Sequence, residues 1–202
     1  RVDYSYDLIS GNVNEVSYQK GKKDQFFHKY TYDEDNRIIE AMTSKDEIIW
    51  EKDASYDYYR HSVLARTTLG DDKVQSCDYA YTIHGWLKGV NSETLESNRD
   101  IGSYKNQTAS IEEKSADDVY GFGLKYYKGD YHDIGAVSEQ DHFRANENAL
   151  YTSINNDLSI TTANGEQGLF NGNISSMVTA NSKFMENGEG PQAMGYKYDQ
   201  LN

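Results

Sequence analysis

The sequence predicts an all-β fold, an antiparallel sheet of consecutive β-hairpins, interrupted by a polar insertion that can contain short helices. Three observations predict it: a tyrosine motif recurs along the chain, side chains around each copy alternate with a period of two, and turn-forming residues follow the copies. A period of two is that of a strand, because successive side chains point to opposite faces of a sheet. The 202 residues include 18 tyrosines, whose rings can supply the apolar surface that aliphatic residues supply elsewhere.

The recurring motif is a pair of tyrosines separated by one residue. Its first four copies begin at Tyr4, Tyr30, Tyr56 and Tyr79, at spacings of 26, 26 and 23 residues, and a further copy begins at Tyr196. The residues assigned to the structural repeat motif are Tyr4, Tyr6, Asp7, Tyr30, Tyr32, Asp33, Tyr56, Tyr58, Tyr79, Tyr81, Tyr196, Tyr198 and Asp199. A unit of this size cannot bury its apolar face alone, so stacked neighbours must cover it.

Each unit reads as a strand, a tight turn, a second strand and a longer connection. Phe26, His28, Tyr30 and Tyr32 alternate with other residues and are expected to share one face of a strand. The aspartates that follow the tyrosine pair, Asp7 and Asp33, stand where a strand would enter a turn. Aspartate side chains accept hydrogen bonds from backbone amides two residues further on, so we interpret both as turn formers rather than catalytic acids.

The chain organisation expected from this pattern has three parts. Residues 1–91 are repeat hairpins, 92–168 are a polar insertion, and 169–202 return to the repeat as part of one continuous repeat region. Within the insertion, residues 119–131 alternate again and predict a strand pair, in which Gly121, Gly123 and Gly129 permit bends or bulges. The insertion is interpreted as surface loops or short helices packed on the sheet, for example over 145–154; a binding role is the alternative.

Composition excludes several classes of partner. The formal net charge of −13 disfavours a nucleic acid or an anionic membrane surface, because both bind clustered Lys and Arg. No apolar run reaches the roughly 18 residues of a membrane span, so no membrane insertion is expected. The lone Cys77 has no internal disulfide partner and is expected to be a buried thiol. The chain begins at Arg1, and we expect a leader and upstream sequence to have been removed.

Motifs that carry chemistry are not found. The five histidines form no i, i+4 pair, and no serine-nucleophile or phosphate-loop motif occurs, so we predict no catalytic residues, no metal and no cofactor. Residues 33–36 resemble part of a calcium loop but lack its glycine and distal glutamate, and a hairpin turn explains them better.

Four segments resemble the repeats of the Rhs/YD-repeat family of bacterial surface and toxin-shell proteins. They are residues 30–38, 78–91, 118–131 and 169–175. The resemblance implies a fragment of an extracellular or bacterial cell-surface protein, in which repeats wind as antiparallel hairpins into a shell. In toxin-complex relatives such a shell encloses a toxic domain, and in teneurins it is an adhesion scaffold. The Asp-Pro core that cleaves encapsulating members is not matched, because Gly190 precedes the only proline, Pro191.

The function expected is therefore a structural β-repeat scaffold, a shell wall or an adhesion scaffold, without catalysis of its own. Its partners are the remaining repeats of the same polypeptide, with a cell-surface glycan or protein as a further candidate. One alternative is a carbohydrate-binding or adhesion module, in which Trp50, Trp86 or repeat tyrosines offer flat faces to sugars, although no residue is assigned to a glycan contact. A second alternative is a glycoside-active enzyme, which needs two carboxylates about 5–10 Å apart.

Overall fold

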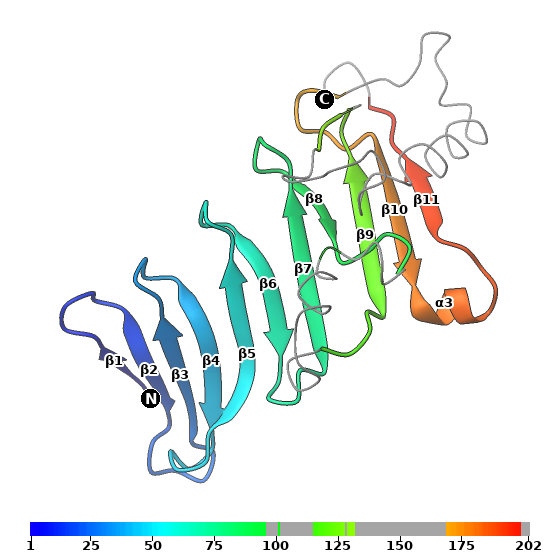
Figure 1. The fold of residues 1–202 in the computed structure, drawn as a ribbon. Coiled ribbons are helices and arrows are strands. Elements are labelled where there is room, and N and C mark those ends of the chain that lie inside the picture. The colour runs from blue at the N-terminus through cyan, green and yellow to red at the C-terminus, as the bar shows by residue number, and fades with distance from the viewer. Residues whose placement is uncertain (96–100, 102–114, 128, 132–168, 199–202) are drawn as a thin grey trace, which may run out of the picture. The chain divides into compact units, whose positions relative to one another are not determined.

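The structure is a computed structural model that describes residues 1–95, 101, 115–127, 129–131 and 169–198 (Figure 1). The chain divides into two compact units, one formed by residues 1–76 with 114–116 and the other by 77–113 with 117–202. Both are built from antiparallel strands, which confirms the predicted all-β class. The predicted division of the chain at residues 91 and 168 stays a prediction.

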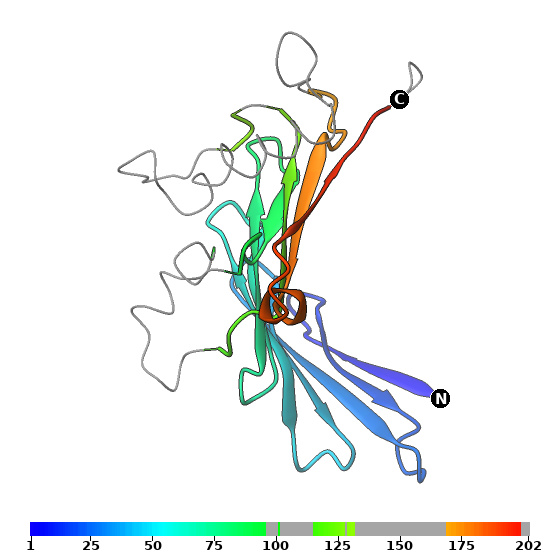
Figure 2. The ribbon, with the colours of Figure 1, turned by 90° about the vertical axis from the view of Figure 1, so that its right-hand side faces the viewer.

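The first unit is a sheet in which each strand pairs with the next strand along the chain. Its strands are β1 (Val2–Tyr6), β2 (Val13–Tyr18), β3 (Phe26–Tyr32), β4 (Ile38–Ser44), β5 (Glu51–Tyr58) and β6 (Leu64–Leu69). In Figure 2 these strands fan out around their common direction, as expected of a twisted sheet. The three tyrosine copies within this unit end β1, β3 and β5, so they occupy the same place in three hairpins.

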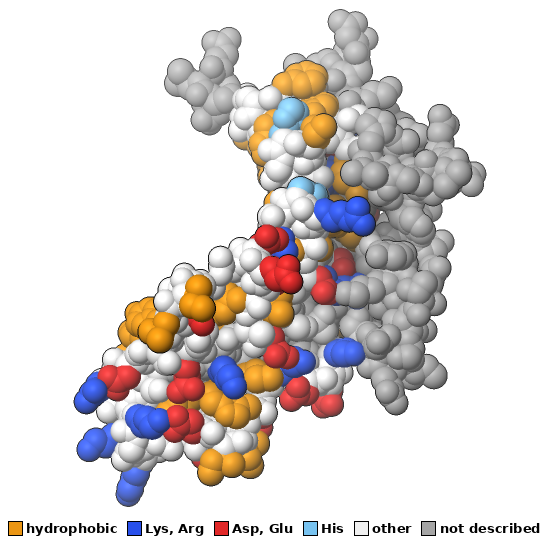
Figure 3. Space-filling model, turned by 60° about the vertical axis from the view of Figure 1, so that its left-hand side comes forward, with side chains coloured by type: hydrophobic (Ala, Val, Ile, Leu, Met, Phe, Trp, Pro, Cys, Tyr) orange, Lys and Arg blue, Asp and Glu red, His pale blue; other side chains and the backbone are white. Residues whose placement is uncertain are grey.

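The apolar core of the first unit is thin. Only Phe27 and Ala54 are buried among its hydrophobic residues, and the register places Phe27 between the buried Ser17 and Ser44. The Lys20 ammonium lies 5.7 Å from the centre of the Phe27 ring and helps to cover it. Figure 3 shows charged side chains of both signs among the apolar ones. The rings of the repeat tyrosines Tyr30, Tyr32, Tyr56 and Tyr58 therefore lie half-buried on the faces of the sheet instead of filling a closed core.

The second unit follows the same neighbour order with longer connections. Its strands are β7 (Gln75–Tyr81, which crosses the boundary between the units), β8 (Leu87–Val90), β9 (Tyr120–Lys125), β10 (Ser176–Asn181) and β11 (Gln192–Gly195). A short helix, α3 (Ser182–Glu186), begins after the N-cap Asn181 and connects β10 to β11. Among the described residues of this unit, the buried hydrophobic ones are Ala80, Leu124, Tyr126, Val178 and Ala180.

The prediction of a strand pair over residues 119–131 was wrong. That segment forms a single strand, β9, which pairs with β8 on one side and with β10 on the other. The residues of this segment alternate because they form one strand, and its two partner strands lie outside the segment. Alternation identifies a strand, but it does not show which strand pairs with it. The insertion consequently splits into two connections, residues 91–119 and 126–175, at the two ends of β9.

The glycines of β9 permit close approach rather than bends. A Cβ on Gly121 would lie 2.1 Å from the carbonyl oxygen of Ser92, and a Cβ on Gly123 would lie 2.2 Å from Oε2 of Glu93. The segment after β8 that contains Ser92 and Glu93, which we call the strap, therefore crosses β9 at two glycines, where no side chain is in the way. Gly129 has a φ of 77° and lies in a turn. The predicted helical turns over 145–154 lie outside the described residues.

Candidate functional site

The tyrosine end of each hairpin has one geometry, which repeats along the chain. In the first four hairpins the second tyrosine is the last residue of the first strand, and the register shifts by one residue beside it. These tyrosines are Tyr6, Tyr32, Tyr58 and Tyr81. Such a bulge strengthens the local twist and re-aims the strand end, and its recurrence shows that the repeat extends to backbone detail.

The turn that follows also repeats. The residue two positions before the second strand has a positive φ in every case, with values of 76° at Gly11, 60° at Asn36, 71° at Ser62 and 79° at Gly85. Glycine and asparagine tolerate this left-handed conformation best. The sequence signal for these turns was therefore present in three of the four positions, and Ser62 is the exception.

The two motif aspartates close these turns. Oδ1 of Asp7 accepts hydrogen bonds from the backbone N–H groups of Ile9 (3.0 Å) and Ser10 (2.7 Å) and from the Ser10 hydroxyl (2.9 Å). Donation by the Ser10 backbone, the Ser10 hydroxyl and the Ile9 backbone lowers the pKa of Asp7. A carboxylate held ionised in this way stabilises a turn and is a poor proton donor.

Asp33 is held in the same way and gains an ion pair. Its Oδ1 accepts from the backbone N–H groups of Asp35 and Arg37, both at 2.9 Å, and its Oδ2 accepts from Nε of Arg37 at 2.7 Å. The Arg37 side chain is the largest cause of the lowered pKa of Asp33, followed by the Arg37 backbone N–H. Both aspartates act as the turn formers that the sequence predicted.

A hydrogen bond from the second tyrosine joins the second hairpin to the first and the third hairpin to the second. The hydroxyl of Tyr32 donates to the main-chain carbonyl of Val13 at 2.8 Å, and that of Tyr58 donates to the carbonyl of Ile38 at 2.8 Å. Val13 and Ile38 are the first residues of β2 and β4. We call this contact the tyrosine staple. Burial raises the pKa of both hydroxyls, so each stays a neutral donor.

The second unit contains two further staples. The hydroxyl of Tyr126 donates to the carbonyl of Leu87 at 2.7 Å, and that of Tyr198 donates to the carbonyl of Ile174 at 2.9 Å. Leu87 begins β8, as Val13 and Ile38 begin their strands. Tyr126 was missed as a motif residue, because it follows β9 after an irregular spacing and no tyrosine stands two positions earlier.

A second side chain packs against the tyrosine ring in two of the staples. The guanidinium carbon of Arg37 lies 4.6 Å from the centre of the Tyr58 ring, and the rings of Trp86 and Tyr126 have centroids 5.1 Å apart. Arg37 and Trp86 both stand directly before the second strand of their hairpin, so they are equivalent positions filled by different chemistry. The contact is cation–π in one case and ring packing in the other, and each adds to the stability of the tyrosine's position.

The remaining motif residues differ in burial. Tyr4, Tyr6, Tyr196 and Tyr198 are exposed, whereas Tyr30, Tyr32, Tyr56, Tyr58, Tyr79 and Tyr81 are half-buried. Phe26, His28 and Tyr30 share one strand face as predicted, with consecutive ring centroids 5.0 and 6.4 Å apart. Asp199 lies outside the described residues.

An aromatic cluster surrounds the Tyr126 staple. The ring of Tyr127 is stacked on Phe170 at 4.7 Å, and His84 lies 4.9 Å from Trp86 and 6.5 Å from Tyr127, all between ring centroids. Phe170 is 75 % exposed, and His84 is exposed as well. Of the two tryptophans named as glycan candidates, Trp86 belongs to this cluster, whereas Trp50 is half-buried under the Lys29 ammonium.

A buried ion pair lies beside this cluster. Nζ of Lys88 lies 2.8 Å from Oδ1 of Asp130, and the side chains are 2 % and 0 % exposed. Oδ2 of Asp130 accepts a hydrogen bond from the backbone N–H of Tyr126, so the pair also fixes the strand end that carries the staple. Lys88 is the extra residue of the bulge between β7 and β8. The sequence offered no sign of this pair, because 42 residues separate its members.

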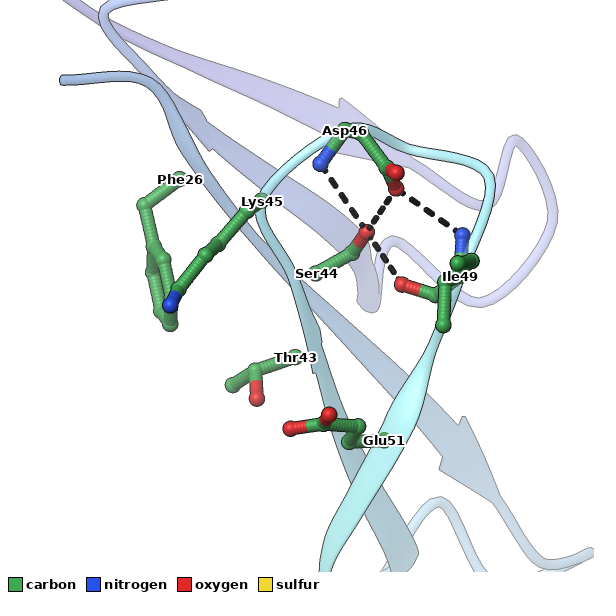
Figure 4. A pocket seen from close by; sticks show the side chains of 7 residues that line it. All are labelled: Phe26, Thr43, Ser44, Lys45, Asp46, Ile49 and Glu51. Carbon is green, nitrogen blue, oxygen red and sulfur yellow. Dashed lines mark hydrogen bonds between the residues drawn. The ribbon is translucent and has the colours of Figure 1, made fainter.

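The hollow shown in Figure 4 is formed by a turn. It lies at the connection from β4 to β5, where Oδ1 of Asp46 accepts from the backbone N–H groups of Ile48 and Ile49, both at 2.9 Å. These bonds lower the pKa of Asp46, with Ile49 the larger cause. The Ser44 hydroxyl lies 3.1 Å from the same oxygen and accepts from the N–H of Glu47, so it also belongs to the turn.

The thiol of Cys77 is half-buried, whereas the sequence predicted a buried thiol, and its partial burial raises its pKa. Within the described ranges no three His, Cys, Asp or Glu side chains gather as metal ligands. The same part of the chain contains no helix long and apolar enough to cross a membrane.

Comparison of the chain with protein-family models, curated proteins and solved structures finds no match. The resemblance to the Rhs/YD-repeat family thus remains a prediction that rests on the motifs themselves.

Proposed function

We propose that this chain is a structural β-repeat scaffold, part of a larger secreted or cell-surface protein of the Rhs type, with no catalysis of its own. The observation that carries the proposal is the tyrosine staple. It recurs at four tyrosines, and each hydroxyl bonds a main-chain carbonyl of an earlier segment, so the contact tolerates any side chain there. A link of this kind suits an array that is extended by repetition.

The chemistry of the turn aspartates supports the same proposal. Asp7, Asp33 and Asp46 are committed to turn amides, and their pKa values are lowered, which favours ionised turn formers over general acids. The partners proposed are the remaining repeats of the same polypeptide.

Duplicating one repeat tests the scaffold proposal. A second copy of residues 26–51, inserted directly after residue 51, should fold as an added hairpin because it brings its own turn, its own stapling tyrosine and a carbonyl for the next one. Hydrogen exchange should show equal amide protection in both copies. The matched control carries Tyr32→Phe in the added copy only and should show faster exchange there. An unprotected added copy in the parent duplication contradicts the proposal.

The cell-surface part has its own test. A protease added to intact producing cells should remove the chain while leaving cytosolic marker proteins whole. Survival of the chain under conditions that strip other surface proteins contradicts that location and leaves the scaffold proposal standing.

The second candidate function is carbohydrate binding at the aromatic cluster. The exposed Phe170 ring, the Tyr127 ring beneath it and the nearby His84 combine flat faces with polar edges, as sugar sites require. Titration with neutral oligosaccharides, followed by Trp86 fluorescence, tests it. Binding that is lost in Phe170→Ala and retained in Leu8→Ala, which removes another exposed apolar side chain, supports this candidate; an unchanged signal across a neutral glycan panel removes it.

A further inference from the structure

The buried pair of Lys88 and Asp130 holds an amine against a carboxyl group. Nζ of Lys88 lies 2.8 Å from Oδ1 of Asp130. Since a carbon–oxygen bond is about 1.2 Å long, Nζ lies within about 4 Å of the carboxyl carbon Cγ. Both side chains are closed off from solvent, whereas those of the ion pair between Lys20 and Glu47 are 55 % and 35 % exposed. The buried pair therefore meets two conditions for amide formation, close contact of the reacting atoms and exclusion of water.

We propose that Nζ of Lys88 and Cγ of Asp130 condense to an isopeptide bond in the folded chain, so that this pair is a site of covalent self-modification. The ion pair is the state from which the amide forms, and the bond ties β8 to the turn that follows β9. The reaction happens once in each chain and acts on no other molecule. It goes beyond the scaffold function and does not depend on it, because it rests on two side chains and the groups that hold them.

The reaction is balanced without a co-reactant. A proton passes from the Lys88 ammonium to Oδ1 of Asp130 along the existing hydrogen bond, which leaves a neutral amine as the nucleophile. The amine lone pair then forms the bond to Cγ, the bond between Cγ and Oδ1 breaks, and Oδ1 takes a second proton from Nζ and leaves as water. The product is a neutral amide, which costs less to bury than a cation and an anion.

A main-chain donor stands where negative charge develops during this reaction. While Cγ is tetrahedral, the charge lies on Oδ2 of Asp130, and Oδ2 already accepts a hydrogen bond of 2.8 Å from the backbone N–H of Tyr126. A donor that is in place before the reaction stabilises such an oxyanion without any rearrangement. The same N–H then bonds the carbonyl oxygen of the finished amide.

Tyr126 also fixes the two partners relative to each other. Its hydroxyl donates to the carbonyl of Leu87, directly before Lys88, at 2.7 Å, while its N–H holds the carboxylate of Asp130. The ring is buried and packs against Trp86. Groups held in contact in this way react as if their concentration were on the order of 10⁵–10⁸ M, which drives a condensation that free amines and carboxylates do not complete in water.

The intact mass of the folded chain tests the proposal. The wild type should be lighter than its sequence by one water molecule, whereas Lys88→Arg should have its full sequence mass. Arginine is the matched control, because it keeps a cation opposite Asp130 while its guanidinium stays protonated and cannot attack a carboxyl carbon. A wild type at full sequence mass overturns the proposal, and so does a loss of water that persists in Lys88→Arg.

Tryptic peptide mapping locates the bond. Trypsin does not cut after an acylated lysine, so residues 74–99 should stay in one piece and should be joined to residues 129–144 in a branched peptide. The exposed pair of Lys20 and Glu47 is the internal comparison, and its residues should appear in separate linear peptides. A missing water that maps to any other part of the chain overturns the proposal.

Discussion

The hydroxyl of Tyr58 donates a hydrogen bond of 2.8 Å to the main-chain carbonyl of Ile38, the first residue of the second strand in the preceding hairpin. Tyr32 makes the same bond to Val13 one repeat earlier. Each bond joins the end of one hairpin's first strand to the start of the second strand of the preceding hairpin.

Removing one staple should weaken the first unit. Tyr32→Phe deletes the hydroxyl and leaves the Val13 carbonyl without its donor, for an expected loss of about 1 kcal/mol in the free energy of unfolding. Urea unfolding followed by Trp50 fluorescence in a Trp86→Phe background reports this unit. The control is Tyr4→Phe, whose ring is exposed, and it should change little. Equal effects of the two substitutions would show that the staple contributes nothing.

Acid should unfold the turns. The folded pKa of Asp33 is lowered, so its contribution is present above the unfolded pKa of about 3.9 and is lost as the pH falls through the folded value. Asp33→Asn should flatten the decline of stability with pH below about 4. Asp3→Asn is the comparison, because Asp3 lies on the exposed edge strand. The measurement is the urea midpoint from pH 7 down to pH 2, and an unchanged slope in Asp33→Asn argues against the ion pair with Arg37.

Adding one methyl group to β9 should disturb the second unit. A Cβ at Gly121 meets backbone atoms of Ser92, which cannot rotate away, so Gly121→Ala is expected to cost about 2 kcal/mol. Gly190→Ala meets nothing within 4 Å and should stay within about 0.5 kcal/mol. Trp86 fluorescence in a Trp50→Phe background follows the unfolding. A stable Gly121→Ala chain would mean that the strap after β8 is held elsewhere.

Breaking the buried ion pair should cost more than replacing it. Lys88→Met leaves the Asp130 carboxylate buried without its cation and should destabilise the second unit by about 3 kcal/mol. The double variant Lys88→Met with Asp130→Leu should recover much of that loss, because neither charge of this pair is then left buried without its partner. A double-mutant cycle in urea measures the coupling. The exposed pair of Lys20 and Glu47 is the control, and additive single effects at Lys88 and Asp130 would show that the two charges do not interact.

The regular part of the fold could be predicted because its signals are local. The alternation around Tyr30 and Tyr32, the turn aspartates Asp7 and Asp33, and the glycine or asparagine at three of the four turns all depend on residues within one hairpin. The positions of Tyr6, Tyr32, Tyr58 and Tyr81 at strand ends follow from that pattern. The roles of Asp7 and Asp33 follow from the hydrogen bonds that a short carboxylate makes to nearby amides.

The second unit could be predicted less well, because its decisive contacts join distant residues. Tyr126 repeats the staple without the tyrosine pair, and Arg37 and Trp86 fill one position with unlike side chains. These positions are equivalent because they occupy the same place in the backbone of their hairpins. Since different residue types fill them, the sequence does not show the equivalence.

By itself, the sequence determined the class of the fold, the period of the repeat and the turn that ends each copy, because strand alternation and turn chemistry act over a few residues. The tertiary structure alone decided that β9 is one strand between β8 and β10, that its glycines admit a crossing strap, and that Lys88 meets Asp130. Each of these three features depends on which segments of the chain come together in space. Contacts between residues far apart in the sequence form only when the hairpins pack side by side.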